Sequence, residues 1–578
     1  MKSKILGEIR QYRGAFVRAA LLMACSALTE SAIPVMTSHI IDEGITGKNL
    51  DAVWTWGAGM LVLALLAFVC ALTAKVNTAK AVTGHAANLR IAVFRAIQSV
   101  PTLTLDKYGT ASLVMRTTTD ITNIQGAVQV VLDTFFSTPV GIIGALILAS
   151  SLNWQLSLLL LAGVVVMAVL LAVIMFATLP VYRRVYDDYD GMNEHLKENI
   201  AGIAVVKSFA REDDAARVFE ANALRVKNGF TKAEKLQALN NPVMMIVLSL
   251  CFAGIGWIGA LLIGDGQMTT GALSAFITYA FQIMSYMAML ILSLVQIVTS
   301  LASIERVKQI LGEEALPADA NDALNRIPNG SVAFDHVSFR YGEGEGKDVV
   351  SDISFAVESG EFVGVVGATG SSKTTMLSLI SRMYEASSGS IRVGGADVGS
   401  YSREALAKDI SWVPQSNVLF TGTVLDNLRF GKADADEQAC EQACRKAEAW
   451  QFVQEMDGGL HARIEQGGAN LSGGQRQRLC LARALIRSPR ILILDDALSA
   501  LDNETESKIR HTLKRESAGM TVFMVTQRMS QASGMDRVIV MDKGRIDAMD
   551  TPTRLLEGNA IYRQLNALED ASGEDGES

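Results

Sequence analysis

The stretch FVGVVGATGSSKTT, residues Phe362–Thr375, specifies an α/β domain in the second half of the chain. A short β-rich apolar run, a glycine turn and then a helix-forming sequence are the context that a phosphate-binding loop requires. Backbone N–H groups and the helix N-terminus hold the phosphates, Lys373 reaches the outer ones, and Thr374 binds Mg²⁺. The residues predicted to hold the nucleotide here are Gly367, Ala368, Thr369, Gly370, Ser371, Ser372, Lys373, Thr374 and Thr375.

One position departs from the usual pattern of this loop, in which two glycines are fixed. Ser372 occupies the second glycine position, directly before Lys373. Serine keeps the backbone N–H donor but adds a Cβ atom where the backbone meets a phosphate. The sequence therefore predicts nucleotide binding that is weakened rather than lost.

Composition divides the 578 residues into two unlike halves. The first half contains several apolar runs of about 20 residues, the length that a helix needs to cross a bilayer. The second half has an ordinary soluble composition. The net charge of −8 argues against nucleic acid as the main partner.

Six membrane spans can be placed, joined alternately by short and long segments. They are Phe16–Ile41, Val53–Thr78, Phe135–Leu152, Leu156–Leu179, Val243–Ile263 and Ala272–Val298. The two long gaps are helical in composition and rich in Arg and Lys, which places them, both termini and the soluble half in the cytoplasm. We expect a multi-pass protein of a bacterial-type plasma membrane, with helices that continue well below the lipid bilayer.

The domain boundaries follow from these patterns. We predict a transmembrane domain over residues 1–312, a Pro- and Asp-rich linker over 313–330, a nucleotide-binding domain over 331–568 and a disordered acidic tail over 569–578. The expected fold is an all-α six-helix membrane domain followed by an α/β domain with a helical subdomain.

Further motifs follow the phosphate-binding loop in a fixed order: WVPQ ending at Gln415, LSGGQ over Leu471–Gln475, ILILDD ending at Asp496, and SALD over Ser499–Asp502. In order and spacing they resemble those of ABC transporters. With the six spans, the resemblance covers essentially the whole chain and is to a half-transporter of the type IV, exporter-like class. Among these it resembles the degenerate-site subunit of heterodimeric bacterial multidrug exporters.

This resemblance assigns roles to single residues. Tyr341 matches the aromatic residue that stacks on adenine, and Gln415 matches the glutamine that touches Mg²⁺. Asp495 matches the Walker B acid. ATP and Mg²⁺ are thus the implied cofactors. The signature residues open a helix, so that their N–H groups can face ATP on an opposing cassette; they are Ser472, Gly473, Gly474 and Gln475.

Two catalytic positions differ from the family pattern. Glutamate normally follows the Walker B aspartate and polarises the attacking water, but Asp496 is one methylene shorter. Gln527 stands at the position where the family usually has the switch histidine. Its amide cannot carry a histidine's charge or proton. A positioned base contributes roughly 10²–10⁴ in rate. We therefore expect a site that binds ATP and hydrolyses it slowly; the alternative is a fully active homodimer that tolerates these changes.

The resemblance also suggests how the membrane domain meets the cassettes. Coupling segments are expected at Tyr108–Asp120, with Arg116 and Asp120, and at Asn199–Glu212, with Lys207 and Phe209. Within the spans, Glu30 is an acid near the middle of the first one, and intramembrane acids are candidate substrate-binding residues. A role for Glu30 in pairing with a partner helix remains open.

Together these features predict ATP-driven export of amphipathic or drug-like small molecules by a heterodimer with a second half-transporter. In that pair, this chain's signature would complete the partner's site. Two alternatives stay open on the residues alone. One is an importer with the same architecture, for example for siderophores, and the other is an ATP-binding regulatory membrane protein.

Overall fold

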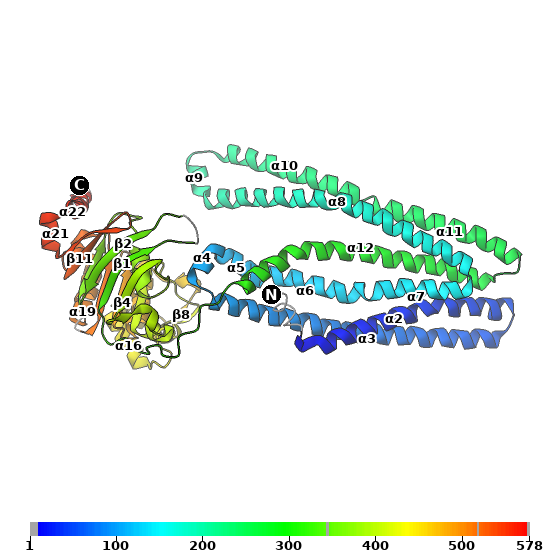
Figure 1. Ribbon diagram of the computed structural model, residues 1–578, viewed down its shortest axis with the longest axis horizontal. Helices are drawn as coiled ribbons and strands as arrows, with labels where there is room; N and C mark the ends of the chain where they lie inside the picture. The colour runs from blue at the N-terminus through cyan, green and yellow to red at the C-terminus, as the bar shows by residue number, and fades with distance from the viewer. Residues whose placement is uncertain (1–9, 343–345, 517–518, 575–578) are drawn as a thin grey trace. The chain divides into compact units, whose positions relative to one another are not determined.

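The computed structural model describes residues 10–342, 346–516 and 519–574, and its chain forms two units (Figure 1). The first comprises the residues up to Gln98 together with Thr110–Glu313. The second comprises Ser99–Gly109 and the residues from Glu314 onward. A short segment from the first half of the sequence therefore belongs to the second unit.

The first unit is entirely helical. Its α-helices are α2 (Arg13–His39), α3 (Leu50–Ser99), α5 (Thr110–Thr117), α6 (Thr119–Val130), α7 (Ser137–Leu152), α8 (Trp154–Ala201), α9 (Ile203–Ser208), α10 (Glu212–Gln237), α11 (Asn240–Gly264) and α12 (Thr270–Gly312). In the described residues, six helical segments are long and apolar enough to cross a membrane, as the sequence predicts.

Several of these helices are much longer than a bilayer is thick. The 48 residues of α8 span about 70 Å at the helical rise, against about 30 Å of hydrocarbon. Apolar side chains such as Leu61 and Val169 point outward and remain exposed, as expected for residues that face lipid. Beyond the apolar part of α8, helices α8 and α10 run side by side and are joined at their tip by α9 (Figure 1).

The second unit contains two main sheets. Its strands are β1 (Val332–Phe339), β2 (Val350–Val357), β3 (Phe362–Val366), β4 (Ser388–Val393), β5 (Ala396–Asp397), β6 (Ile410–Val413), β7 (Gly422–Thr423), β8 (Arg463–Ile464), β9 (Ile491–Asp495), β10 (Thr521–Val525), β11 (Arg537–Asp542) and β12 (Arg545–Asp550). The larger sheet has the order β12-β11-β3-β10-β9-β6, and only β12 runs antiparallel to its neighbour.

Helices surround these sheets and complete the second unit. They are α4 (Thr102–Tyr108), α13 (Lys373–Ile380), α14 (Arg403–Asp409), α15 (Val424–Gly431), α16 (Glu437–Lys446), α17 (Trp450–Glu455), α18 (Gly473–Leu485), α19 (Asn503–Glu516), α20 (Met529–Ala532), α21 (Pro552–Gly558) and α22 (Ala560–Glu574). Helix α22 continues into the predicted acidic tail, whose residues 575–578 lie outside the described part of the chain.

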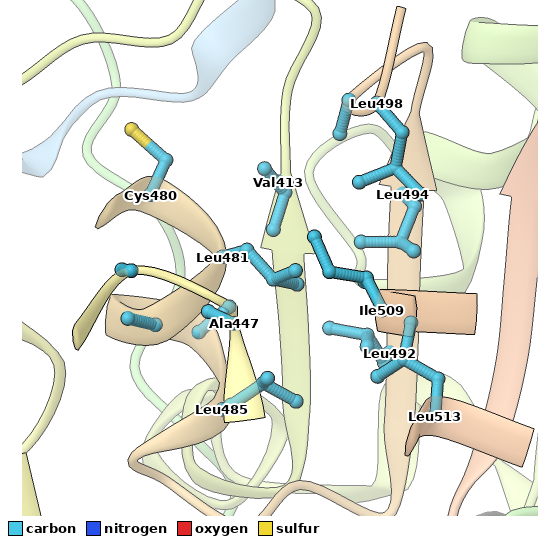
Figure 2. Close-up of a cluster of buried hydrophobic side chains, with 14 of the residues drawn as sticks. Val413, Ala447, Cys480, Leu481, Leu485, Leu492, Leu494, Leu498, Ile509 and Leu513 are labelled. Atoms are coloured by element: carbon cyan, nitrogen blue, oxygen red, sulfur yellow. The ribbon is translucent and has the colours of Figure 1, made fainter. Parts of the chain in front are cut away.

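The hydrophobic core of the second unit fastens α18 to the large sheet. Leu481 and Leu485 of α18 lie towards Val413 of β6, and Leu492 of β9 lies beside Ile509 of α19 (Figure 2). All five side chains are buried. This packing fixes the start of α18, where the LSGGQ sequence lies, to a rigid support.

Candidate functional site

Four neighbouring parallel strands bring distant parts of the sequence to one edge of the large sheet. The adjacent strands are β3, β10, β9 and β6, in that order. The phosphate-binding loop follows β3, Gln527 follows β10, Asp495 ends β9 with Asp496 next, and Gln415 follows β6. The carboxyl ends of parallel strands share one edge, where open α/β sheets bind ligands. The predicted ATP-binding motifs therefore converge on one site.

The loop after β3 is built for close approach of a phosphate. Gly367 has φ = 151°, and a Cβ atom there would collide with the backbone oxygen of Met541. Lys373 is 8% exposed, and its Nζ donates to the backbone oxygens of Gly367 and Ala368 at 2.9 and 2.8 Å. Burial lowers the pKa of Lys373. The hydrogen-bond partners of Lys373 are neutral, and the carboxylates of Asp495 and Asp496 offset the effect of burial only in part, so a phosphate can supply a further counter-charge.

Ser372 introduces backbone strain at the start of α13. It has φ = 74°, the left-handed conformation, which for a residue with a Cβ atom costs roughly 1–2 kcal/mol. No side chain caps the helix at this position. The first backbone N–H groups of α13 thus remain available to an anion. Weakened but retained phosphate binding at this loop stays a prediction.

The two acids after β9 lie in different hydrogen-bonding environments. Thr374 Oγ1 donates to Asp495 Oδ1 at 3.0 Å, whereas Gln415 Nε2 approaches Asp496 Oδ2 at 3.5 Å. Burial raises the pKa of both aspartates. Oxygen atoms of Thr374, Asp495 and Gln415 suit Mg²⁺, which prefers hard oxygen ligands. Gln527 is exposed beside them at the end of β10.

Tyr341 is connected to the phosphate-binding helix. Its hydroxyl lies 2.9 Å from Thr375 Oγ1, and its ring packs edge-on against Phe339 and Tyr384. The side chain is 45% exposed, so part of the aromatic surface is open to a ligand. A flat base could stack on this exposed surface.

The signature sequence forms a regular, capped helix start. Ser472 is the N-cap of α18, and its Oγ accepts a hydrogen bond from the backbone N–H of Gln475 at 3.2 Å. The Gln475 side chain accepts in return from the Ser472 N–H at 2.9 Å. Gln477 Oε1 accepts from the backbone N–H of Ala500 at 3.0 Å. The signature and the SALD segment are thus held together.

The first predicted coupling segment is placed differently by the structure. Asp120 is fully buried and pairs with Arg306 of α12, with Nε at 2.9 Å from Oδ2. Arg116 is also buried, and it donates to the Arg306 backbone oxygen and to Gln309 Oε1. Arg116 and Asp120 therefore join α5 and α6 to α12 inside the first unit, and the expectation that they form a docking surface needs correction.

The segment that does associate with the cassette lies slightly earlier, in α4. Asp106 of α4 accepts a hydrogen bond from the Tyr384 hydroxyl at 2.7 Å. Tyr384 in turn packs against Tyr341. Sequence reasoning missed this pair because Asp106 and Tyr384 are 278 positions apart and no motif contains either residue. The DKYG sequence, which ends this short helix, was the only local signal.

The remaining predicted residues belong to the first unit. Phe209 is 73% exposed just after α9, and Lys207 is exposed beside it, at the tip formed by α8–α10. The role of this exposed tip as a docking element stays a prediction. Glu30 lies in α2, where its Oε2 accepts a hydrogen bond from the Tyr286 hydroxyl at 3.3 Å.

Comparison with known proteins connects both units to one family. The profile described as the ABC transporter transmembrane region matches residues 17–287, and the ABC transporter profile matches residues 350–499. An uncharacterized ABC transporter ATP-binding protein of Mycobacterium tuberculosis is 34% identical over 572 residues, covering 98% of this chain and 97% of that protein. An ATP-dependent lipid A-core flippase of Chromohalobacter salexigens is 28% identical, with coverages of 98% and 97%.

A solved structure shares the fold of the chain. The structure of a bacterial Atm1-family ABC exporter with ATP bound has a TM-score of 0.79 and 21% identity, and the match covers 97% of this chain and 99% of that one. The chain belongs to the ABC transporter family. It is an ATP-hydrolysing half-transporter with an exporter-type fold, a multi-pass plasma-membrane protein whose ATPase cassette is cytoplasmic.

Proposed function

We propose that the chain is the degenerate-site half of a heterodimeric ABC exporter. The observation that carries this proposal is the contrast within one cassette. The signature start at Ser472 is complete and capped, whereas the ATP site contains the strained Ser372 and the short acid Asp496. An unequal pair explains both, because one chain then needs a good signature but only a nucleotide-binding site.

In this site the residues bind ATP better than they catalyse its hydrolysis. Lys373 and the N-terminus of α13 hold phosphates, and Tyr341 stacks on the base. Thr374, Gln415 and Asp495 would hold Mg²⁺, which when bound neutralises charge on the phosphate oxygens.

Catalysis at this site is limited by the reach of the base. Asp496 would orient and polarise the attacking water, but its carboxylate is one methylene shorter than the family's glutamate. A misplacement of about 1 Å can cost on the order of 10² in rate. Burial also raises the pKa of Asp496, which reduces the share of the base form at a given pH. Gln527 can donate a hydrogen bond but adds no charge.

Transport would follow from closure of the two cassettes. ATP binding at both sites brings them together, and the coupling segments, α4 and the α9 tip, pass that movement to the membrane helices. Hydrolysis at the partner's site, completed by Ser472 and Gly474 of this chain, resets the pair. An amphipathic or drug-like cargo is consistent with a relative whose name describes it as a lipid A-core flippase.

The test is the ATPase rate of the chain purified in lipid, alone and with the product of a neighbouring transporter gene. We expect negligible turnover alone and at least a tenfold higher rate for the pair. Robust turnover alone that disappears with Lys373→Ala would contradict the proposal, because it would make the chain a working homodimer.

A further inference from the structure

Near the middle of α2 lies an acid, Glu30, that no cationic side chain pairs with in the part of the chain that the structure describes. Glu30 lies well inside both ends of this membrane-crossing helix and is exposed in the single chain. Among the described residues, no Lys, Arg or His forms an ion pair with it. Charged groups inside membrane spans are energetically expensive and usually face a cavity or serve a substrate pathway. Glu30 therefore requires a counter-charge from outside this chain or an aqueous cavity.

The polar groups of α12 near Glu30 offer more hydrogen-bond acceptors than donors. The Tyr286 hydroxyl donates to Glu30 Oε2 at 3.3 Å and accepts from Gln282 Nε2 at 3.3 Å. The other amide atom, Gln282 Oε1, is buried and has no hydrogen-bond partner within the described part of the chain. An ionised carboxylate only accepts, so the cluster lacks a donor.

The position of Tyr286 is supported from behind by α7. A Cβ atom on Gly141 would collide with the Tyr286 ring, so this glycine allows the ring to pack directly on the α7 backbone. Two turns earlier on α12, the Tyr279 hydroxyl donates to the backbone oxygen of Ser31 at 2.9 Å. Helices α2, α7 and α12 thus hold the cluster in place before any ligand arrives, which reduces the ordering cost of binding.

We propose that Glu30, Gln282 and Tyr286 form the recognition site for the protonated amine of an amphipathic cargo molecule. An alkylammonium group carries several N–H donors and a positive charge, which match the exposed carboxylate of Glu30 and the hydroxyl oxygen of Tyr286. This inference rests on the proposed export function and names its substrate class.

The experiment uses three probes with the same apolar body. They are a dansyl-labelled primary alkylamine, its quaternary trimethylammonium analogue and its neutral acetamide. Binding to the full chain in lipid nanodiscs is measured by dansyl fluorescence, which needs neither a partner nor turnover. We expect the amine to bind most tightly, because it alone offers both charge and N–H donors, and the acetamide most weakly.

Variants of Glu30 and Tyr286 then test whether these residues cause the preference for the amine probe. Glu30→Gln should weaken amine binding by about tenfold or more and leave acetamide binding unchanged. Glu30→Asp, which keeps the charge, should recover part of the loss, and Tyr286→Phe should weaken amine binding by about threefold. The matched control is Glu43→Gln, which neutralises an exposed acid beyond α2 that bonds to Trp56. It should leave all three affinities unchanged.

The outcomes separate this inference from the function on which it rests. Equal binding of the three probes, or an amine preference that survives Glu30→Gln, would overturn the cation site. A Glu30→Gln chain that binds amine normally but no longer assembles with its partner would overturn it as well and assign Glu30 to subunit pairing. Glu30-dependent binding without amine stimulation of the pair's ATPase would support the site and count against export.

Discussion

Two helix starts within one cassette use the same residue type to opposite effect. Ser472, before α18, has φ = −66° and caps the helix through its side chain. Ser372, before α13, has φ = 74° and makes no cap. Serine suits an extended N-cap because its hydroxyl satisfies a free N–H group. In the left-handed conformation, by contrast, the serine Cβ atom lies too close to the following carbonyl oxygen, which strains the backbone.

The difference shows where this cassette retains its family's design and where it departs from it. The signature start is reinforced by reciprocal hydrogen bonds with Gln475 and by the buried packing of α18 (Figure 2). The site at the sheet edge is strained at Ser372, and Asp496 stands where the family has the longer glutamate. The signature and the ATP site of this cassette are therefore expected to respond very differently to mutation.

The largest expected effect comes from blocking the signature. Ser472→Arg in this chain should lower the ATPase rate of the heterodimer by about 100-fold or more, because it removes a donor to the partner's ATP and fills its space. Asp496→Asn should lower the same rate by less than about threefold, since it removes only the weak base of this site and leaves the groups that bind ATP in place. Steady-state ATPase assays of the two reconstituted pairs measure both. Equal losses of ATPase rate would show that the signature and the ATP site of this chain contribute equally to turnover.

Restoring the family's catalytic residues should raise the chain's own activity. We expect Asp496→Glu combined with Gln527→His to increase turnover by about 10- to 100-fold, because the longer acid reaches the water and the imidazole adds charge near the γ-phosphate. Single-turnover hydrolysis by the chain with its partner's site inactivated gives the measurement. Asp496→Asn is the matched control and should show no gain.

The residual rate of the unaltered site should also depend on pH. Burial raises the pKa of Asp496, and the deprotonated carboxylate is the base. The rate should therefore rise as pH increases through this elevated pKa, and fall at acidic pH sooner than it would with an ordinary aspartate. A flat profile for the same single-turnover reaction would argue that Asp496 is not the base.

A smaller gain is expected from relieving the strain at the start of α13. Ser372→Gly should tighten ATP binding by about 3- to 10-fold, because glycine adopts the left-handed conformation without penalty. Binding of a fluorescent ATP analogue to the full chain measures the change. Ser381→Gly, at an ordinary φ of −86° after the same helix, is the control and should leave affinity unchanged.

The smallest expected effect concerns the connection between α4 and the ATP site. Removing the Asp106–Tyr384 hydrogen bond by Tyr384→Phe or Asp106→Ala should lower cargo-stimulated ATPase activity about two- to fivefold, with less change in the basal rate. The double variant should cost no more than either single change if the pair acts as one contact. Additive losses would show that the residues act separately.

Most of the ATP site was predictable because its motifs are local. The loop before Lys373, the acids after β9 and the signature before α18 each lie within a few residues and carry their own chemistry. The coupling region was less predictable. The family resemblance placed Arg116 and Asp120 in a coupling segment, but both contact Arg306, which lies 186 positions after Asp120.

By itself, the amino-acid sequence determined the six spans, the α/β cassette and the order of its motifs, because hydrophobic length and local residue pattern dictate these features. Only the tertiary structure decided that Ser372 adopts a left-handed conformation, that α4 joins the cassette, and that Glu30 meets Tyr286. Backbone strain and contacts between distant segments depend on how the elements pack, and this information is spread over the whole chain rather than held in any one motif.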